Sequence, residues 1–206
     1  DLHSFPTRRS SDLNRFSSIK RNTKETQVKL ELNLDGTGKT KIDTGVGFFD
    51  HMLTLMAFHG KMDLEIQAVG DLYVCDHHLV EDVGISLGEA FSEAFGDKRG
   101  IERYGSSRLV MDEALSQVDV DISGRGVSVF NCDFKREKIG EMSSEMIREF
   151  FYAFAINAKI GLHINSLYGE NDHHIAESIF KAVGRALKDA KKTVSDELPS
   201  TKDFLG

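Results

Sequence analysis

The chain has 206 residues, enough for one large domain or two small ones. Its formal net charge of −7 argues against a general nucleic-acid-binding protein, because such proteins carry a basic surplus that neutralises phosphates. Two cysteines are too few for a disulfide framework, and no apolar run approaches the roughly 20 residues of a membrane helix. We therefore expect a cytoplasmic protein with reduced thiols and no membrane partner.

The first thirteen residues show no sustained helical or strand period and hold one of the two prolines in the chain. They also resemble a translated sequencing adapter. We expect residues 1–13 to be a disordered tail that is not native to the fold, and residues 14–206 to form the domain.

The remaining chain shows two successive sets of strands and helices. Strand-like alternation and helical spacing predict, in order, a strand at 26–34, a helix at 48–58, a strand at 62–69 and a helix at 77–95 that Asp76 opens as N-cap. The second set comprises strands near 108–111, 117–123 and 127–134, a helix at 143–157, a strand at 160–166 and a helix at 173–191 that Asp172 opens.

An internal repeat relates the two sets. Residues 76–94 match residues 172–190 at an offset of 96, with seven of nineteen positions identical, and residues 61–66 match 159–164 at an offset of 98. Each half contains the pattern Asp-His-His-x-x-Glu. The repeat predicts an internally duplicated α+β fold with pseudo-twofold symmetry and halves at about 21–105 and 106–195.

The duplicated pattern has the residue types and the spacing of metal ligands. Residues four apart share one face of a helix, so His77 points with Glu81, and His173 points with Glu177. The adjacent His78 and His174 lie about 100° around each helix, which favours two ions rather than one. A buried hydrogen-bond network inherited by duplication is the alternative. Ligand chemistry alone favours zinc or iron slightly over manganese.

Several other residues could complete a site. His51, His59 and His163 lie near the repeated patterns, although each alone is equally typical of a core or cap residue. Arg103, Arg125, Lys181 and the segment 199–202 could bind a phosphate, although each alone is more often a solvated surface charge. Without a Walker A loop or a Rossmann fingerprint, nothing indicates a nucleotide cofactor.

The ordered set of segments from about Arg21 to Lys202 resembles imidazoleglycerol-phosphate dehydratase. The resemblance rests on TKETQVKLELNLDGTG, TGVGFFDHMLTLMAFHG, VGDLYVCDHHLVEDVGISLG, GDKRGIERYGSSRLVMDEAL, DISGRG, GLHIN, GENDHHIAESIFKAVGRAL and PSTK. It implies two similar halves, each with a four-stranded sheet and two helices, and helices packed between the sheets. It also implies a homo-oligomer of 24 subunits, with active sites between subunits and two Mn²⁺ ions per site.

The resemblance also implies roles for individual residues. The implied metal ligands are His51, His77, His78, Glu81, His173, His174 and Glu177, with Glu149 added because it stands where some members have a histidine. The implied substrate contacts are Glu25, His51, His59, His77, Glu81, Arg103, Arg125, His173, Lys181, Ser200, Thr201 and Lys202. Asp203 departs from the glycine often found there and adds a negative charge beside the expected phosphate site.

The implied reaction is the removal of water from D-erythro-1-(imidazol-4-yl)glycerol 3-phosphate to give 3-(imidazol-4-yl)-2-oxopropyl phosphate in histidine biosynthesis, through a dimanganese-bound imidazolate. We expect Glu25, His59 or Asp112 to move the protons. Two other functions compete with this hydro-lyase. One is a manganese phosphohydrolase of the DHH type, in which Asp119 and Asp121 would supply an Asp-x-Asp motif. The other is a metal-storage shell.

Overall fold

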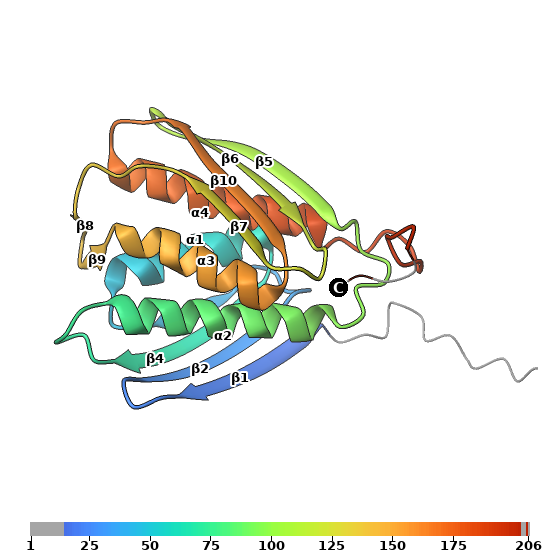
Figure 1. Cartoon of the computed structure of the whole chain (residues 1–206), viewed down its shortest axis with the longest axis horizontal. Helices are drawn as coiled ribbons and strands as arrows, with labels where there is room; N and C mark the ends of the chain where they lie inside the picture. The colour runs from blue at the N-terminus through green and yellow to red at the C-terminus, as the bar shows by residue number, and fades with distance from the viewer. Residues whose placement is uncertain (1–14, 203–204, 206) are drawn as a thin grey trace, which may run out of the picture.

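The structure is a computed structural model that describes residues 15–202 and residue 205. Within this part the chain forms four helices and two four-stranded sheets, and the helices lie between the sheets (Figure 1). The helices are α1 (Gly47–Gly60), α2 (His77–Phe95), α3 (Glu145–Ala158) and α4 (Asp172–Ala190). The expected tail at 1–13 and the departure at position 203 lie outside the described residues.

The first sheet has the strand order β1-β2-β4-β3. Its strands are β1 (Phe16–Asn22), β2 (Thr26–Asn33), β3 (Thr40–Asp43) and β4 (Asp63–Gly70). Strand β2 pairs antiparallel with β1 and β4, whereas β3 pairs parallel with β4 because α1 connects the two. Alternate residues of β2 are buried, so this sheet covers the helices with one face and exposes the other.

The second sheet repeats this topology in the order β5-β6-β10-β7. Its strands are β5 (Tyr104–Met111), β6 (Ala114–Asp121), β7 (Val127–Asn131) and β10 (Gly161–Tyr168). Strand β6 pairs antiparallel with β5 and β10, and β7 pairs parallel with β10 across α3. A two-residue ladder of β8 (Lys138–Ile139) and β9 (Met142–Ser143) is added in the connection from β7 to α3.

Corresponding residues of the two halves adopt corresponding conformations. Lys61 and Lys159 both end their helices in the left-handed region, with φ of 51° and 56°, and donate their amides to the last turn. Gly88 and Gly184, at the repeat offset of 96, both lie where a neighbouring helix backbone approaches closely. The fold is therefore the duplicated α+β arrangement that the repeat predicts.

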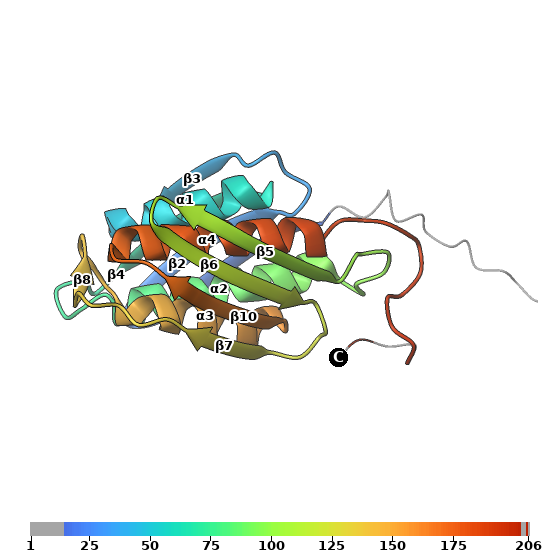
Figure 2. The same ribbon diagram turned by 90° about the horizontal axis from the view of Figure 1, so that it is seen from above.

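The core lies where the helices meet between the sheets. Figure 2 shows the second sheet lying across the helices. Helix α2 packs against α3, and α1 packs against α4. Phe150 is fully buried there, and its ring stacks on Phe180 at 5.6 Å and meets the edge of Phe49 at 5.1 Å. None of the helices in the described chain combines the length and the apolar character that crossing a bilayer requires.

The structure corrects several local predictions. Sequence patterning missed β1, β3 and the β8–β9 ladder, and it started β5 four residues late. Asp76 occupies the N-cap position of α2 as predicted, but its side chain makes no capping hydrogen bond, because its carboxylate accepts from the amide and hydroxyl of Ser143 instead. Asp172 is the first residue of α4 and accepts from the amides of Lys135 and Arg136. The cap of α4 is Asn171, whose side chain accepts from the His173 amide.

Candidate metal and active site

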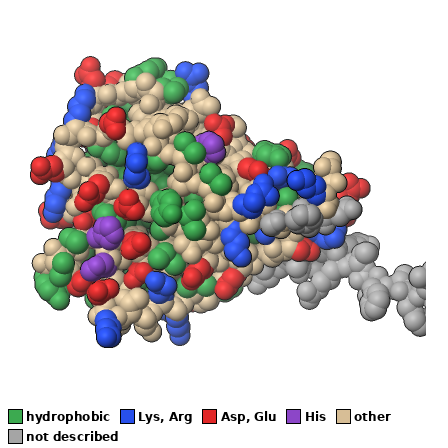
Figure 3. All heavy atoms as spheres, viewed as in Figure 1, with side chains coloured by type: hydrophobic (Ala, Val, Ile, Leu, Met, Phe, Trp, Pro, Cys, Tyr) green, Lys and Arg blue, Asp and Glu red, His purple; other side chains and the backbone are tan. Residues whose placement is uncertain are grey.

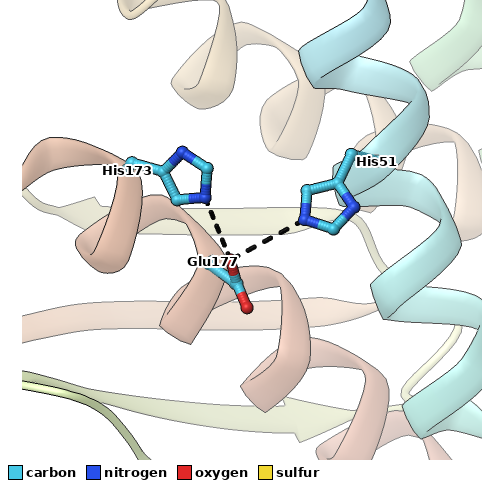
Figure 4. A group of neighbouring side chains, drawn as sticks. All are labelled: His51, His173 and Glu177. Carbon is cyan, nitrogen blue, oxygen red and sulfur yellow. Dashed lines mark hydrogen bonds and ion pairs between the residues drawn. The ribbon is translucent and has the colours of Figure 1, made fainter.

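Two histidines and one carboxylate converge between α1 and α4. Glu177 Oε2 lies 3.1 Å from His173 Nε2 on its own helix and 3.7 Å from His51 Nε2 on α1 (Figure 4). One ligand atom from each residue lies within 4.8 Å of the other two. Among the described residues, no other group of three His, Cys, Asp or Glu side chains converges in this way. Imidazole nitrogen with carboxylate oxygen is a donor set that suits divalent transition ions.

The spacing of the two helices determines this convergence. His173 and Glu177 share a face of α4 because they are four residues apart, but His51 reaches them only if α1 lies close. Gly184 permits that approach, since a Cβ atom there would lie 3.0 Å from the Gly60 amide nitrogen and 3.2 Å from His59 Cβ. The site thus depends on a glycine that touches none of its ligands.

Basic side chains follow the group of His51, His173 and Glu177 along α1 and α4. We call these three residues the ligand group. Lys181 lies one turn beyond it on α4, and its Nζ is 2.5 Å from Glu177 Oε1. Burial raises the pKa of the Glu177 carboxyl, but the Lys181 ammonium and His173 outweigh burial and hold this pKa below its usual value. Burial, followed by the charges of Lys181 and Arg185, lowers the pKa of His59. His59 is therefore favoured as a neutral imidazole near neutral pH.

The matching group of the first half is more open. His77 Nε2 lies 3.8 Å from Glu81 Oε2, with both side chains nearly half exposed. Glu149 is the fifth residue of α3, as His51 is of α1, so the two residues are counterparts. Unlike His51, however, Glu149 does not lie within ligand distance of the His and Glu of its own half, His77 and Glu81. Adjacent histidine rings diverge on both helices, with interplanar angles of 77° and 83°. The two rings of each pair therefore lie in different planes.

The second histidine of each pair contacts a carboxylate through Nδ1. His78 Nδ1 lies 3.0 Å from Asp71, and His174 Nδ1 lies 2.7 Å from Glu113. Asp112 Oδ2 lies 3.5 Å from His174 Nε2. Glu25, in the β1–β2 turn, is close enough to His78 for its charge to raise the histidine pKa, after the larger effect of the Asp71 hydrogen bond. The acid–base candidates Glu25 and Asp112 thus occupy equivalent hairpin turns.

Sequence patterning missed Asp71 and Glu113. Glu113 accepts from the amides of Asn171 and Glu170, and these bonds together with His174 lower its pKa to about 2. The available signal was that both carboxylates follow the end of a strand, but which histidine each would contact depends on tertiary packing.

The phosphate-binding candidates other than Lys181 lie at the opposite end of the molecule. Arg103 pairs with Asp121 through two nitrogens at 2.8 and 3.3 Å and donates to the Pro199 carbonyl. Exposed Arg125 and buried Ser123 line a hollow on the outer face of the second sheet beside Asp121. Figure 3 shows Lys and Arg side chains gathered beside the C-terminal segment, away from two histidines at the other end. Ser200, Thr201 and Lys202 follow Pro199 directly, with Thr201 and Lys202 exposed.

The remaining candidates lie outside the ligand group. Asp119 accepts from Ser106 and Gln117 on the outer sheet face, and Asp121 is occupied by Arg103, so neither faces a DHH helix. His163 is exposed on the same outer face. Both cysteines are free thiols, and burial is the main cause that raises the pKa of Cys132 to about 12.

Comparisons with known proteins agree with these features. The family model described as imidazoleglycerol-phosphate dehydratase matches residues 44–187. A protein of that name from Clostridium botulinum is 60% identical over 193 residues, covering 93% of this chain and 99% of the relative. The crystal structure of the enzyme from Staphylococcus aureus has a TM-score of 0.79 at 41% identity, covering 87% of this chain and 99% of that chain. A structure from Pyrococcus furiosus, in complex with (S)-C348, has a TM-score of 0.79 at 38% identity, covering 91% and 100%.

Proposed function

We propose, from the premise that this chain belongs to the imidazoleglycerol-phosphate dehydratase family and is a hydro-lyase, that it dehydrates imidazoleglycerol phosphate at a site built on two divalent ions. The product would be 3-(imidazol-4-yl)-2-oxopropyl phosphate, and the reaction would serve histidine biosynthesis in the cytoplasm. The observation that carries this proposal is the convergence of His51, His173 and Glu177 in a chain of this family.

The donor atoms fit a divalent transition ion, and the resemblance favours Mn²⁺. His51, His173 and Glu177 already lie within ligand distance of one another, and Glu177 is nearly buried. The other proposed ligands are His77, His78, Glu81, Glu149 and His174. A divalent ion held by these residues would supply Lewis acidity at the site. Adjacent histidines of each pair would serve different ions because their rings diverge.

The protons would be moved by side chains that border the ligands. The substrate must lose a proton from carbon, and its hydroxyl must gain one in order to leave as water. Glu25 and Asp112 are carboxylates in turns beside His78 and His174, so each can accept a proton close to the ring. His59 is favoured as neutral imidazole and can accept or relay a proton beside Lys181.

A second copy of the chain is needed to complete this site. Arg103 donates its amide to the carbonyl of Ala190 at the end of α4, whereas His173 lies at the start of that helix. The rise of an α-helix separates these positions by about 25 Å, far more than a three-carbon phosphate ester can span. We therefore propose that Arg103, Arg125 and the segment 199–202 of one subunit bind the phosphate of a substrate held at the metal end of another. Active sites between subunits of a 24-subunit homo-oligomer would meet this requirement.

The direct test supplies purified protein with Mn²⁺ and imidazoleglycerol phosphate and follows the ketone product. Wild-type protein should form it, and His173→Ala should lose both bound metal and turnover. Glu65→Ala is the control, since Glu65 is exposed on the outer face of the first sheet and is neither a proposed ligand nor a phosphate-binding candidate, and it should retain both. Metal-replete, assembled wild-type protein that forms no ketone would refute the proposal. Release of inorganic phosphate instead would identify a phosphohydrolase, and retention of metal without turnover would identify a storage shell.

A further inference from the structure

The second histidines of the two repeated patterns are held alike by residues that are not equivalent. His78 Nδ1 lies 3.0 and 3.2 Å from the two oxygens of Asp71, and His174 Nδ1 lies 2.7 Å from Glu113 Oε2. Asp71 directly follows β4 and begins the connection to α2, whereas Glu113 belongs to the turn between β5 and β6. Two different positions of the chain therefore supply a carboxylate to the same ring atom.

The repeat explains why the two carboxylates come from different places. At the offset of 98 that relates β4 to β10, the counterpart of Asp71 is Gly169. A Cβ atom at Gly169 would lie only 2.5 Å from Ile175 Cγ1 and 2.9 Å from Ala114 Cβ, so no aspartate fits there. Glu113 supplies the missing carboxylate from the neighbouring hairpin. An inherited contact would have used equivalent positions, so the recurrence of the contact indicates that it has a function.

The contact determines which ring nitrogen is free. An ionised carboxylate only accepts hydrogen bonds, so in each neutral ring Nδ1, which lies 3.0 Å from Asp71 or 2.7 Å from Glu113, carries the proton and Nε2 keeps its lone pair. Asp112 lies farther from His174 Nε2, at 3.5 Å, and does not compete for that proton. Glu113 is itself fixed by the amides of Asn171 at 2.8 Å and Glu170 at 3.2 Å. Hydrogen bonds of this kind orient a histidine and raise its basicity as a metal ligand.

We propose that Asp71 and Glu113 are positioning residues that hold His78 and His174 in the Nδ1–H tautomer and thereby direct Nε2 of each ring toward a divalent cation. This inference rests on the proposed function, in which both histidines are metal ligands. Neither carboxylate would touch the ion or the substrate. Their effect would pass through the two imidazoles.

The test measures Mn²⁺ binding by calorimetry on the whole protein, with activity as a separate readout. Removal of a partner that orients a metal-bound histidine typically weakens metal affinity about 10- to 100-fold. Glu113→Ala and Asp71→Ala should each show such a loss in one of two binding steps. Glu113→Gln and Asp71→Asn should lose less, because an amide oxygen still accepts from Nδ1. Glu170→Gln is the matched control, because Glu170 contributes only its backbone amide to this cluster and its exposed side chain should not affect affinity.

A second readout separates positioning from a general structural role. ¹⁵N NMR of the metal-free ring should show one tautomer for His174 in wild type and a mixture in Glu113→Ala, at unchanged far-ultraviolet circular dichroism. If the alanine variants bind Mn²⁺ within threefold of wild type, the inference is overturned while the proposed function stands. If wild type itself binds no divalent ion, the proposed function fails first. If Glu113→Ala does not fold, Glu113→Gln decides the question. The inference then requires that wild type bind Mn²⁺ more tightly than Glu113→Gln.

Discussion

The close approach of α1 and α4 predicts the effect of Gly184→Ala. The new Cβ atom would overlap the Met56 carbonyl oxygen and would lie 3.0 Å from the Gly60 nitrogen, both of which are helix backbone. Neither atom can turn aside as a side chain can, so α1 must move away by on the order of 1 Å. Overpacking of this kind costs about 1–3 kcal/mol. For a chain of this length the melting temperature should fall by about 2–12 °C.

The same displacement moves His51 away from Glu177, which it now approaches at 3.7 Å. A shift of about 1 Å in a positioned group can cost on the order of 100-fold in rate. Gly184→Ala should therefore lower Mn²⁺ affinity and kcat as well as stability. Gly47→Ala on α1 is the control, because its Cβ would meet nothing within 4 Å and alanine favours the helix. Wild-type stability and metal affinity in Gly184→Ala would show that this contact does not set the helix spacing.

Three further predictions concern the core, pH and metal. Phe150→Ala should cost about 3–5 kcal/mol in denaturant unfolding, whereas exposed Tyr152→Ala on the same helix should be nearly neutral; equal losses would contradict the core assignment. Burial, followed by the charge of Arg15, lowers the pKa of Lys191 to about 8, so between pH 8 and 10 the unfolded chain binds the additional proton. The free energy of unfolding of wild type should therefore rise by about 2 kcal/mol relative to that of Lys191→Met as pH rises over this range. A difference between the two proteins that does not change with pH would refute the lowered pKa of Lys191. Chelation should lower the melting temperature, and Mn²⁺ at about 100 times its Kd should restore about 2.7 kcal/mol; an unchanged transition would contradict binding to the folded protein.

The long helices and the duplication could be predicted from the sequence, whereas the edge strands could not. Helices α2 and α4 each carry 19 residues of clear helical period, and the repeat fixes their equivalence. In β1, Phe16 is exposed and Ser17 is buried, so the polarity pattern runs against the burial pattern. Strand β3 has four residues, too few for alternation to be recognised.

The candidate site divides in the same way. Residues four apart on one helix were predictable, because helical geometry alone places His173 beside Glu177. The contact of His51 with Glu177 depends on two glycine-containing helix surfaces meeting, and the contact of Glu113 with His174 depends on a hairpin lying beside a helix start. Such contacts follow from packing between elements distant in sequence. Arg103 was singled out as a cation, but its pairing with Asp121 follows from the first residues of β5 facing the end of β6.

The electrostatics of the helix starts explains the number of carboxylates at this end. Helices α2 and α4 both begin at the same end of the molecule, and a helix N-terminus carries partial positive charge that opposes a bound cation (Figure 1). Two dications at these helix starts would be unfavourable unless acidic groups outnumbered the bases there. The surrounding acidic residues are Glu25, Asp71, Glu81, Asp112, Glu113 and Glu177. In the proposed site only some of them would be direct ligands, and the others would contribute to charge balance. The sequence signature of the proposed site is therefore incomplete without its turn carboxylates, and neutralising several of them together should lower the affinity for divalent ions even where no proposed ligand is removed.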